Sequence, residues 1–161
     1  MKFDAHTYFK DICSKLKLTK DTYKFTRVTS LNNAEEILQN MRRHSNFFAI
    51  DDTEDGFTFK SGAGYFKRRT YTVYVLKKFK ALDQGAQHEA IEEARLIYDK
   101  VCSKLIHDKA KLANEMVYLK DERFAFKEIE GIFGDNMTGI FFMITVDVPM
   151  DLRYNINDWE E

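Results

Sequence analysis

The hydrophobic positions near the start of the chain follow a helical repeat. From Asp4 to Leu18, apolar residues recur at steps of three and four, which predicts an amphipathic helix with one buried stripe. A second helix is predicted from Ser30 to Met41, because Ser30 is a suitable N-cap and Glu35 and Glu36 follow early in the segment.

After residue 45 the pattern changes to that of strands. The segments NFFAID (46–51) and GFTFK (56–60), joined by an acidic turn, predict a hairpin. Residues 61–64 (SGAG) predict a flexible connection. The segment RTYTVYVLKKF (69–79) is dense in Thr, Tyr and Val and has apolar residues on both faces, so we expect a strand inside a sheet, covered on both sides for part of its length.

The second half of the chain predicts one long helix and two strands. Helical spacing of apolar residues runs from Gln87 to His107 and continues toward Met116. Segments 123–132 and 138–148 alternate as strands around the turn FGDNM, and we expect Pro149 to end the second. The order lacks strand–helix alternation, so we predict an α+β fold in which helices, including one long central helix, pack on a mainly antiparallel sheet of about five strands. We expect a single domain over residues 1–150 and a C-terminal arm over residues 151–161.

Composition and charge narrow the class of protein. The 161 residues are 44% hydrophobic, with one proline and seven glycines, which excludes a disordered, collagen-like or linker protein. No apolar run is long enough to span a bilayer, so we expect no membrane partner. The N-terminus lacks the apolar core of a secretory signal, and we expect the protein to be made in the cytoplasm.

The two halves of the chain have opposite charge. Residues 1–80 contain 16 Lys and Arg against 9 Asp and Glu, whereas residues 81–161 contain 9 against 17. Two interpretations stay open. Opposite faces of neighbouring copies could meet in a head-to-tail ring, or the fold could interleave the halves into a mixed surface.

The sequence contains no recognisable catalytic motif. Cys13 and Cys102 lack metal-ligand spacing and are expected as buried or half-buried thiols, and the four histidines lack the spacing of a zinc site. The acidic cluster at residues 51–56 fails the calcium-loop pattern, because Gly62 stands where a bidentate Glu is needed. We therefore expect no catalytic residues, no metal, no cofactor and no enzymatic activity.

Clustered basic residues at 67–69 suggest a second class of function. Lys67, Arg68 and Arg69 follow two glycines, but the glycines lie between strands rather than before a helix, which argues against a phosphate-binding P-loop. A basic loop could instead contact nucleic acid or an acidic partner. Tyr65 and Phe66 would then stack on bases, and the phosphate-contacting stripe would also include Lys60, Lys77, Lys78 and Lys80. The alternative is an exposed loop with ordinary charges.

Aromatic residues near turns and termini suggest an interface. They are Phe47, Phe48, Phe57, Phe59, Tyr65, Phe66, Phe124, Phe126, Phe133 and Trp159, and they either anchor an interface or fill a large core. The arm after Pro149 alternates apolar Leu152, Tyr154, Ile156 and Trp159 with polar residues, as in a segment that docks in a groove of its own domain or of a neighbouring subunit. We expect Trp159, the only tryptophan, to be at least partly buried. The candidate assembly residues are thus Trp159, Tyr154, Leu152 and Phe133.

The segment from Gly131 to Trp159 (GIFGDNMTGIFFMITVDVPMDLRYNINDW) resembles the C-terminal region of small tail-associated proteins of bacteriophages and prophages of Bacteroides-like bacteria. The order of elements is also similar to that of phage tail-terminator and head-tail connector proteins. The resemblance implies a structural, non-enzymatic virion component that forms a homo-oligomeric ring, commonly a hexamer, at the tail end or head-tail junction. It also implies contacts with other phage tail or connector proteins, passing contact with DNA, and location in the virion after synthesis in the host cytoplasm. The alternative function is that of a nucleic-acid-binding accessory protein that uses the basic loop around residues 60–80.

Overall fold

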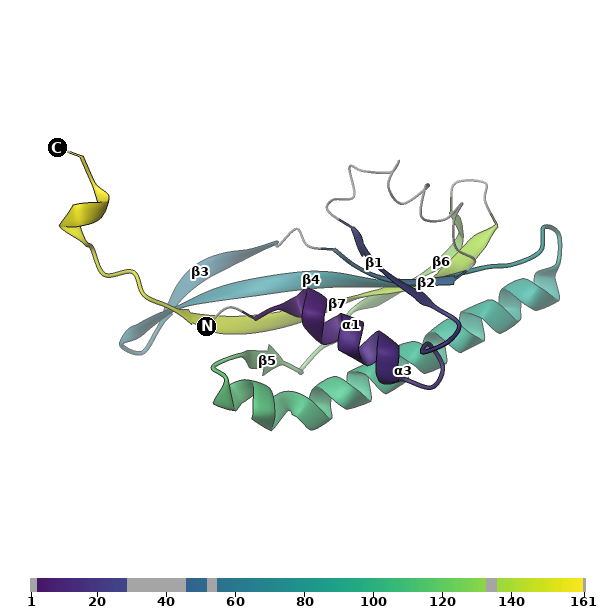
Figure 1. The fold of residues 1–161 in the computed structure, drawn as a ribbon, viewed down its shortest axis with the longest axis horizontal. Helices are drawn as coiled ribbons and strands as arrows, with labels where there is room; N and C mark the ends of the chain where they lie inside the picture. Colours follow the sequence, from purple (N-terminus) through teal and green to yellow (C-terminus); the bar gives the residue numbers. More distant parts are fainter. Residues whose placement is uncertain (1–2, 29–45, 52–54, 133–135, 161) are drawn as a thin grey trace.

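The computed structural model describes residues 3–28, 46–51, 55–132 and 136–160. Helices α1 (Ala5–Lys15) and α3 (Gln84–Asn114) lie on one face of a sheet (Figure 1). Each begins at an aspartate whose carboxylate accepts a backbone N–H of the first turn, Asp4 for α1 and Asp83 for α3. The 31 residues of α3 span about 46 Å, so the predicted long central helix is confirmed.

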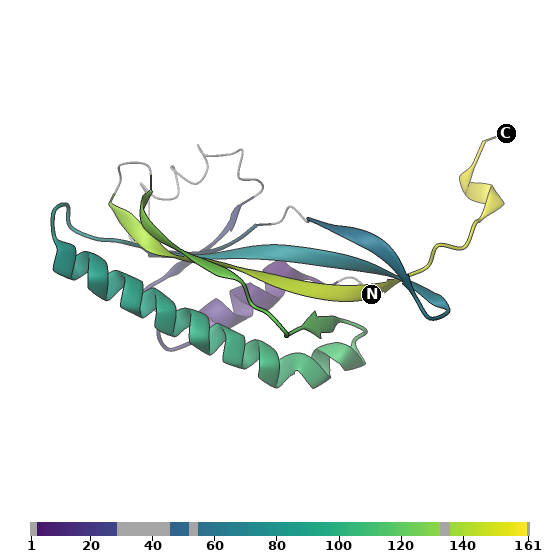
Figure 2. The same ribbon diagram turned by 180° about the vertical axis from the view of Figure 1, so that it is seen from behind.

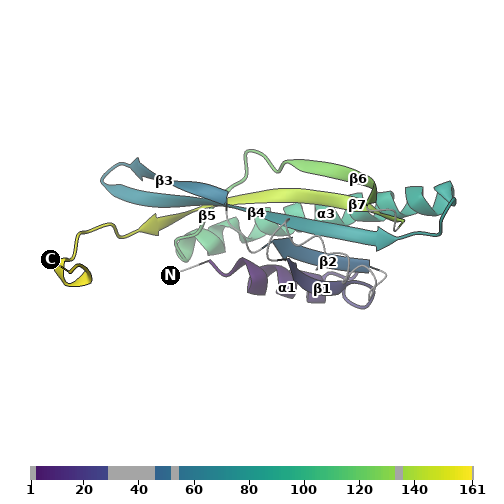
Figure 3. The ribbon, with the colours of Figure 1, turned by 90° about the horizontal axis from the view of Figure 1, so that it is seen from above.

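Seven strands form one mixed, mainly antiparallel sheet, which confirms the predicted α+β class with more strands than the expected five. Their bounds are β1 (Lys24–Val28), β2 (Asn46–Asp51), β3 (Asp55–Ser61), β4 (Gly64–Lys78), β5 (Tyr118–Lys120), β6 (Phe126–Ile132) and β7 (Met137–Met150). Strands β4 and β7 pair antiparallel from Tyr65–Met150 to Lys78–Met137 and form the long central ribbon. Strands β2 and β3 share the outer edge of β4, and β5 and β6 share the outer edge of β7 (Figure 3). The parallel pair is β1 with β2.

Apolar residues of the ribbon face both sides of the sheet. Tyr71, Val73 and Val75 of β4 join the main core with α1 and α3, whereas Tyr74 and Leu76 join a smaller core on the other face. This confirms that the strand is covered on both sides for part of its length. On the last strand, Ile140, Phe142, Ile144, Val146 and Val148 all lie in the main core, as their alternation predicts.

Several local predictions are wrong. Segments 46–51 and 56–60 do not form a hairpin with each other, because both pair with β4. Residues 61–64 close a tight β3–β4 hairpin rather than a flexible connection, with Ser61 opposite Gly64 and Gly62 at a φ of +59°. Strand β7 continues one residue past Pro149. The short strands β1 and β5 were not predicted, and the helix expected at Ser30–Met41 lies outside the described residues.

Candidate functional site

Four aromatic side chains form a continuous array on the sheet face turned away from α1 and α3, at the end of the sheet where β3 meets β4. Phe57 and Phe59 of β3 lie opposite Arg68 and Phe66 of β4, and Tyr118 of β5 completes the row. Ring centroids lie 5.9 Å apart for Phe57–Phe59, 5.8 Å for Phe59–Phe66 and 6.0 Å for Phe66–Tyr118. We call this array the aromatic face. Phe57 is 56% exposed, so the face presents apolar surface to solvent.

Arg68 lies at the centre of the aromatic face and is held on two sides. Its guanidinium carbon lies 5.4 Å from the ring centroid of Phe57 and 5.2 Å from that of Phe59. The same guanidinium donates two hydrogen bonds to the carboxylate of Asp147, at 2.7 and 2.8 Å. These bonds raise the pKa of Arg68. Asp147 is only 7% exposed, so the positive charge of Arg68 is largely neutralised by a buried partner.

The basic residues predicted as one contact surface are divided between the two faces of β4. Residues 67–69 belong to β4, so the predicted basic loop is a strand and its side chains alternate between faces. Lys67 and Arg69 lie opposite Val148 and Val146, on the helix side, and Arg68 lies on the aromatic face. Farther along β4, Lys77 forms an ion pair of 2.5 Å with Glu93 of α3, and Lys78 lies on the other face.

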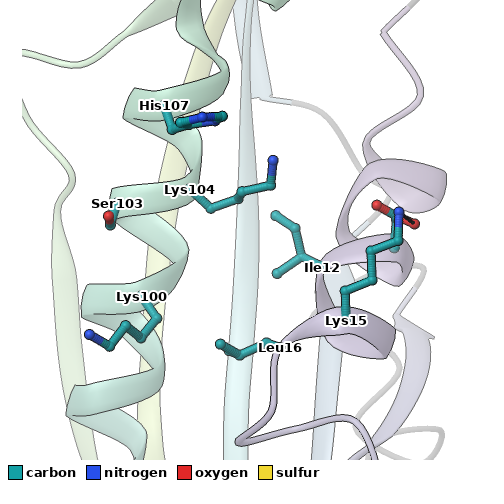
Figure 4. Close-up of a pocket in the computed structure, with 8 residues that line it drawn as sticks. Ile12, Lys15, Leu16, Lys100, Ser103, Lys104 and His107 are labelled. Carbon is teal, nitrogen blue, oxygen red and sulfur yellow. Dashed lines mark ion pairs between the residues drawn. The ribbon is translucent and has the colours of Figure 1, made fainter.

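A groove of about 450 Å³ runs between α1 and α3 on the surface of the helix layer. Ile12 and Leu16 of α1 point into the space between the helices, and Lys104 reaches toward it from α3 (Figure 4). The other lining residues are Asp11, Lys15, Lys100, Ser103 and His107. Polar side chains surround an apolar floor, so we call this feature the helix groove.

A hydrogen-bonded carboxylate joins the two helices at one end of the helix groove. Asp108 of α3 accepts hydrogen bonds from the hydroxyl of Tyr8 at 3.0 Å and from Lys104 at 2.6 Å, and His107 Nδ1 lies 3.0 Å from it. Burial acts to raise the pKa of Asp108, but the hydrogen bonds from these three neighbours outweigh it and hold the pKa at about 2. Burial raises the pKa of Tyr8, and the bond to Asp108 adds to this effect. The network fixes the spacing of α1 and α3, and with it the width of the groove.

The C-terminal arm leaves the sheet after β7 and extends past the end of the domain (Figure 1). It contains one short 3-10 turn, Ile156–Asp158, and every described residue from Asp151 to Glu160 is exposed. The indole of Trp159 stacks on Tyr154, with centroids 6.0 Å apart and an interplanar angle of 21°. Trp159 is nevertheless 66% exposed, so the arm does not dock on its own domain in this structure.

The other predicted interface aromatics divide between core and surface. Phe47 and Phe48 are buried and belong to the core, which removes them as interface candidates. Phe57, Tyr65 and Phe126 are exposed, and Phe59, Phe66 and Phe124 are half-buried. Phe133 lies outside the described residues.

Sequence reasoning missed Tyr118, Asp147 and the lysines of the helix groove. The spacing of Lys100, Lys104 and His107 indicates that they share one face of a helix. No pattern in the sequence indicates that α1 lies beside that face.

Both cysteines lie among the described residues, Cys13 buried and Cys102 half-buried, as predicted. Burial raises the pKa of Cys102 to about 11 and also raises that of Cys13, so both thiols are protonated at neutral pH. Among the residues with described positions, no group of three or more His, Cys, Asp or Glu side chains could hold a metal ion. Part of the acidic cluster, residues 52–54, lies outside that set. No helix within the described ranges is long and apolar enough to cross a membrane.

Comparison of the chain with protein-family models gives no match, and comparison with curated proteins gives no similar sequence. The features of the described structure that bear on function are the aromatic face, the helix groove and the C-terminal arm.

Proposed function

We propose that the protein is a non-enzymatic structural component that assembles into homo-oligomers through its C-terminal arm. The observation that carries the proposal is the exposure of four large apolar side chains on one short segment: Leu152 at 49%, Tyr154 at 72%, Ile156 at 60% and Trp159 at 66%. We further propose that this oligomer is a ring at the tail end or head-tail junction of a bacteriophage, as in the tail-terminator and head-tail connector proteins that the chain resembles.

The free energy available from covering the arm is large enough to support assembly. A tryptophan side chain can bury about 150–250 Å², and Trp159 is 66% exposed, so covering the rest of it contributes about 2.5–4 kcal/mol before the costs of association. Trp159 and its three apolar neighbours lie within eight residues of each other in the sequence. Such a compact set of anchors is typical of a segment that binds a groove.

The direct test is the mass of the protein in solution. Light scattering coupled to size exclusion at micromolar protomer concentration, with negative-stain imaging, should show a closed oligomer for the wild-type chain. Trp159→Ala should yield folded monomers or smaller species, because the arm contributes nothing to the described core. Leu82→Ala is the control, since Leu82 is fully exposed in the β4–α3 turn and lies outside the arm. A wild-type monomer at all accessible concentrations would overturn the proposal.

The aromatic face favours single-stranded nucleic acid binding as a second candidate function. Exposed rings on a sheet can stack on bases, and Lys120 and Arg123 line the adjoining hollow of about 390 Å³. Binding of a fluorescent single-stranded oligonucleotide should then weaken steeply with salt. The double variant Phe57→Ala, Tyr118→Ala should weaken it further, whereas Lys67→Ala on the opposite face should have a smaller effect. No binding at low salt would eliminate this candidate.

A further inference from the structure

We infer that the C-terminal arm of one copy docks in the helix groove of a second copy. The inference rests on the proposed function and adds to it the receptor surface, the direction of assembly and the residues that form the contact.

The helix groove offers the apolar contact that the arm lacks. Its floor is formed by Ile12 and Leu16, and its volume of about 450 Å³ exceeds that of the hollows at the aromatic face, about 390 and 300 Å³. On the opposite side, Lys104 of α3 is exposed and reaches toward this floor (Figure 4). A large flat ring such as that of Trp159 can lie between these side chains with its faces against aliphatic carbon.

Charge complementarity favours the arm as the occupant. Asp151 is already paired with Arg153 at 2.5 Å, which leaves Asp158, Glu160 and Glu161 to give the end of the arm a net negative charge. The groove is lined by three lysines, Lys15, Lys100 and Lys104, against one carboxylate, Asp11. Within the described part of the chain, Lys15 pairs with Asp11 and Lys104 with Asp108, and Lys100 has no ion pair. An acidic, aromatic segment therefore matches both the apolar floor of the groove and its excess of positive charge.

The aromatic face is a poorer receptor for an acidic segment. The cation at its centre, Arg68, already donates two hydrogen bonds to Asp147, and Lys120 pairs with Glu122 at 3.3 Å. Carboxylates of an incoming arm would meet two internal carboxylates there, Glu122 and Asp147, against the one, Asp11, that lines the groove.

The direction of the arm favours docking in the groove of a neighbouring copy over docking in the groove of its own chain. The arm leaves β7 on the side of the sheet away from the two helices and extends past the end of the ribbon (Figure 2). Its eleven residues, 151–161, reach about 36 Å when extended, which is enough to cross to an adjacent subunit. Arm and groove are different surfaces, so the contact is head-to-tail and closes a ring when the rotation between copies allows it.

The first experiment uses Trp159 as the probe, since it is the only tryptophan. The full-length Trp159→Ala chain is a tryptophan-free receptor, and a synthetic peptide of residues 150–161 is the titrant. Docking should shift the peptide fluorescence to shorter wavelength, and salt should weaken the binding. Adding Lys100→Glu and Ser103→Glu to the receptor should weaken binding by about tenfold or more, because both changes place carboxylates in the groove. Adding Lys10→Glu, an exposed lysine of α1 outside the groove, is the matched control and should change binding by less than about twofold.

The second experiment tests the direction of assembly. A chain with Trp159→Ala has an intact groove but an impaired arm. A chain with Lys100→Glu and Ser103→Glu has an intact arm but an impaired groove. Each variant should be monomeric by itself, whereas an equimolar mixture should form heterodimers and no larger species, because only one competent contact can form.

The outcomes separate the inference from the proposed function. If the double variant Lys100→Glu, Ser103→Glu forms the same oligomers as the wild type, the proposed assembly is supported but the groove is not the receptor. A wild-type monomer whose receptor variant still binds the peptide would show that the arm occupies its own groove, and would overturn the second copy as occupant. A wild-type monomer whose receptor variant binds no peptide would overturn both. Peptide binding that the groove changes abolish, together with heterodimers in the mixture, would support the inference.

Discussion

The pairing of Arg68 with Asp147 gives the sharpest test of how the aromatic face is held together. The perturbation is Arg68→Met, which keeps an aliphatic side chain between the rings of Phe57 and Phe59 but removes both hydrogen bonds to Asp147. The side chain of Asp147, of which only 10% is exposed, would then remain nearly buried without its partner.

The magnitude follows from this asymmetry in burial. Leaving a buried carboxylate unpaired costs about 3–5 kcal/mol, and we take the lower end, about 3 kcal/mol, because the Arg68 side chain is 30% exposed and water can enter in its place. The reverse change, Asp147→Leu, should cost only about 1 kcal/mol, since the guanidinium can turn to solvent and still stack on the rings. The double variant should cost about 1 kcal/mol or less, because an apolar pair leaves no unpaired charge.

Urea denaturation followed by circular dichroism, at one fixed protomer concentration, measures all three losses. For a chain of this size, Arg68→Met should also lower Tm by about 6–12 °C. The double-mutant cycle should give a coupling of about 3 kcal/mol or more between the two side chains. A loss below about 1 kcal/mol for Arg68→Met, or equal losses for both single variants, would refute the argument that burial of Asp147 sets the energy.

Two further predictions concern acid stability and backbone packing. The pKa of Asp108 is about 2 in the folded protein, below its ordinary value of 3.8, so this carboxylate contributes stability that is fully present above about pH 4 and is lost as the pH falls toward 2. In urea titrations, the free energy of unfolding of the wild-type chain should exceed that of Asp108→Asn, and this difference should be about 2 kcal/mol larger at pH 5 than at pH 2. A difference that does not change with pH would contradict this prediction. Gly139→Ala should cost more than about 3 kcal/mol or prevent folding, because the added Cβ would lie 2.0 Å from the carbonyl oxygen of Val75. Gly62→Ala, at a φ of +59° in an open turn, should cost only about 1 kcal/mol, and thermal melts that show equal losses for the two glycines would disprove the distinction.

The local features of this fold could be predicted because they depend on residues that are neighbours along the chain. The apolar repeat of α3 is set within a few turns, and the predicted start at Gln87 lies three residues from the observed start at Gln84. Alternation in β7 likewise assigned Ile140 to Val148 to the core face without knowledge of any partner strand.

Strand pairing and the candidate surfaces were decided by tertiary structure. Strands β2 and β3 are adjacent in sequence, but β4 is long enough to pair with both along one edge, so the apolar pattern that predicted a hairpin could not identify the partner. Lys67, Arg68 and Arg69 form one basic cluster in sequence, yet the two-residue period of β4 separates them onto opposite faces, where Asp147 neutralises the middle one. The helix groove depends on α1 lying beside α3, about ninety residues apart in sequence. Helical and strand periods are local properties of the backbone, whereas the choice of neighbour is made by burial across the whole chain, and this is why the elements could be predicted and the surfaces between them could not.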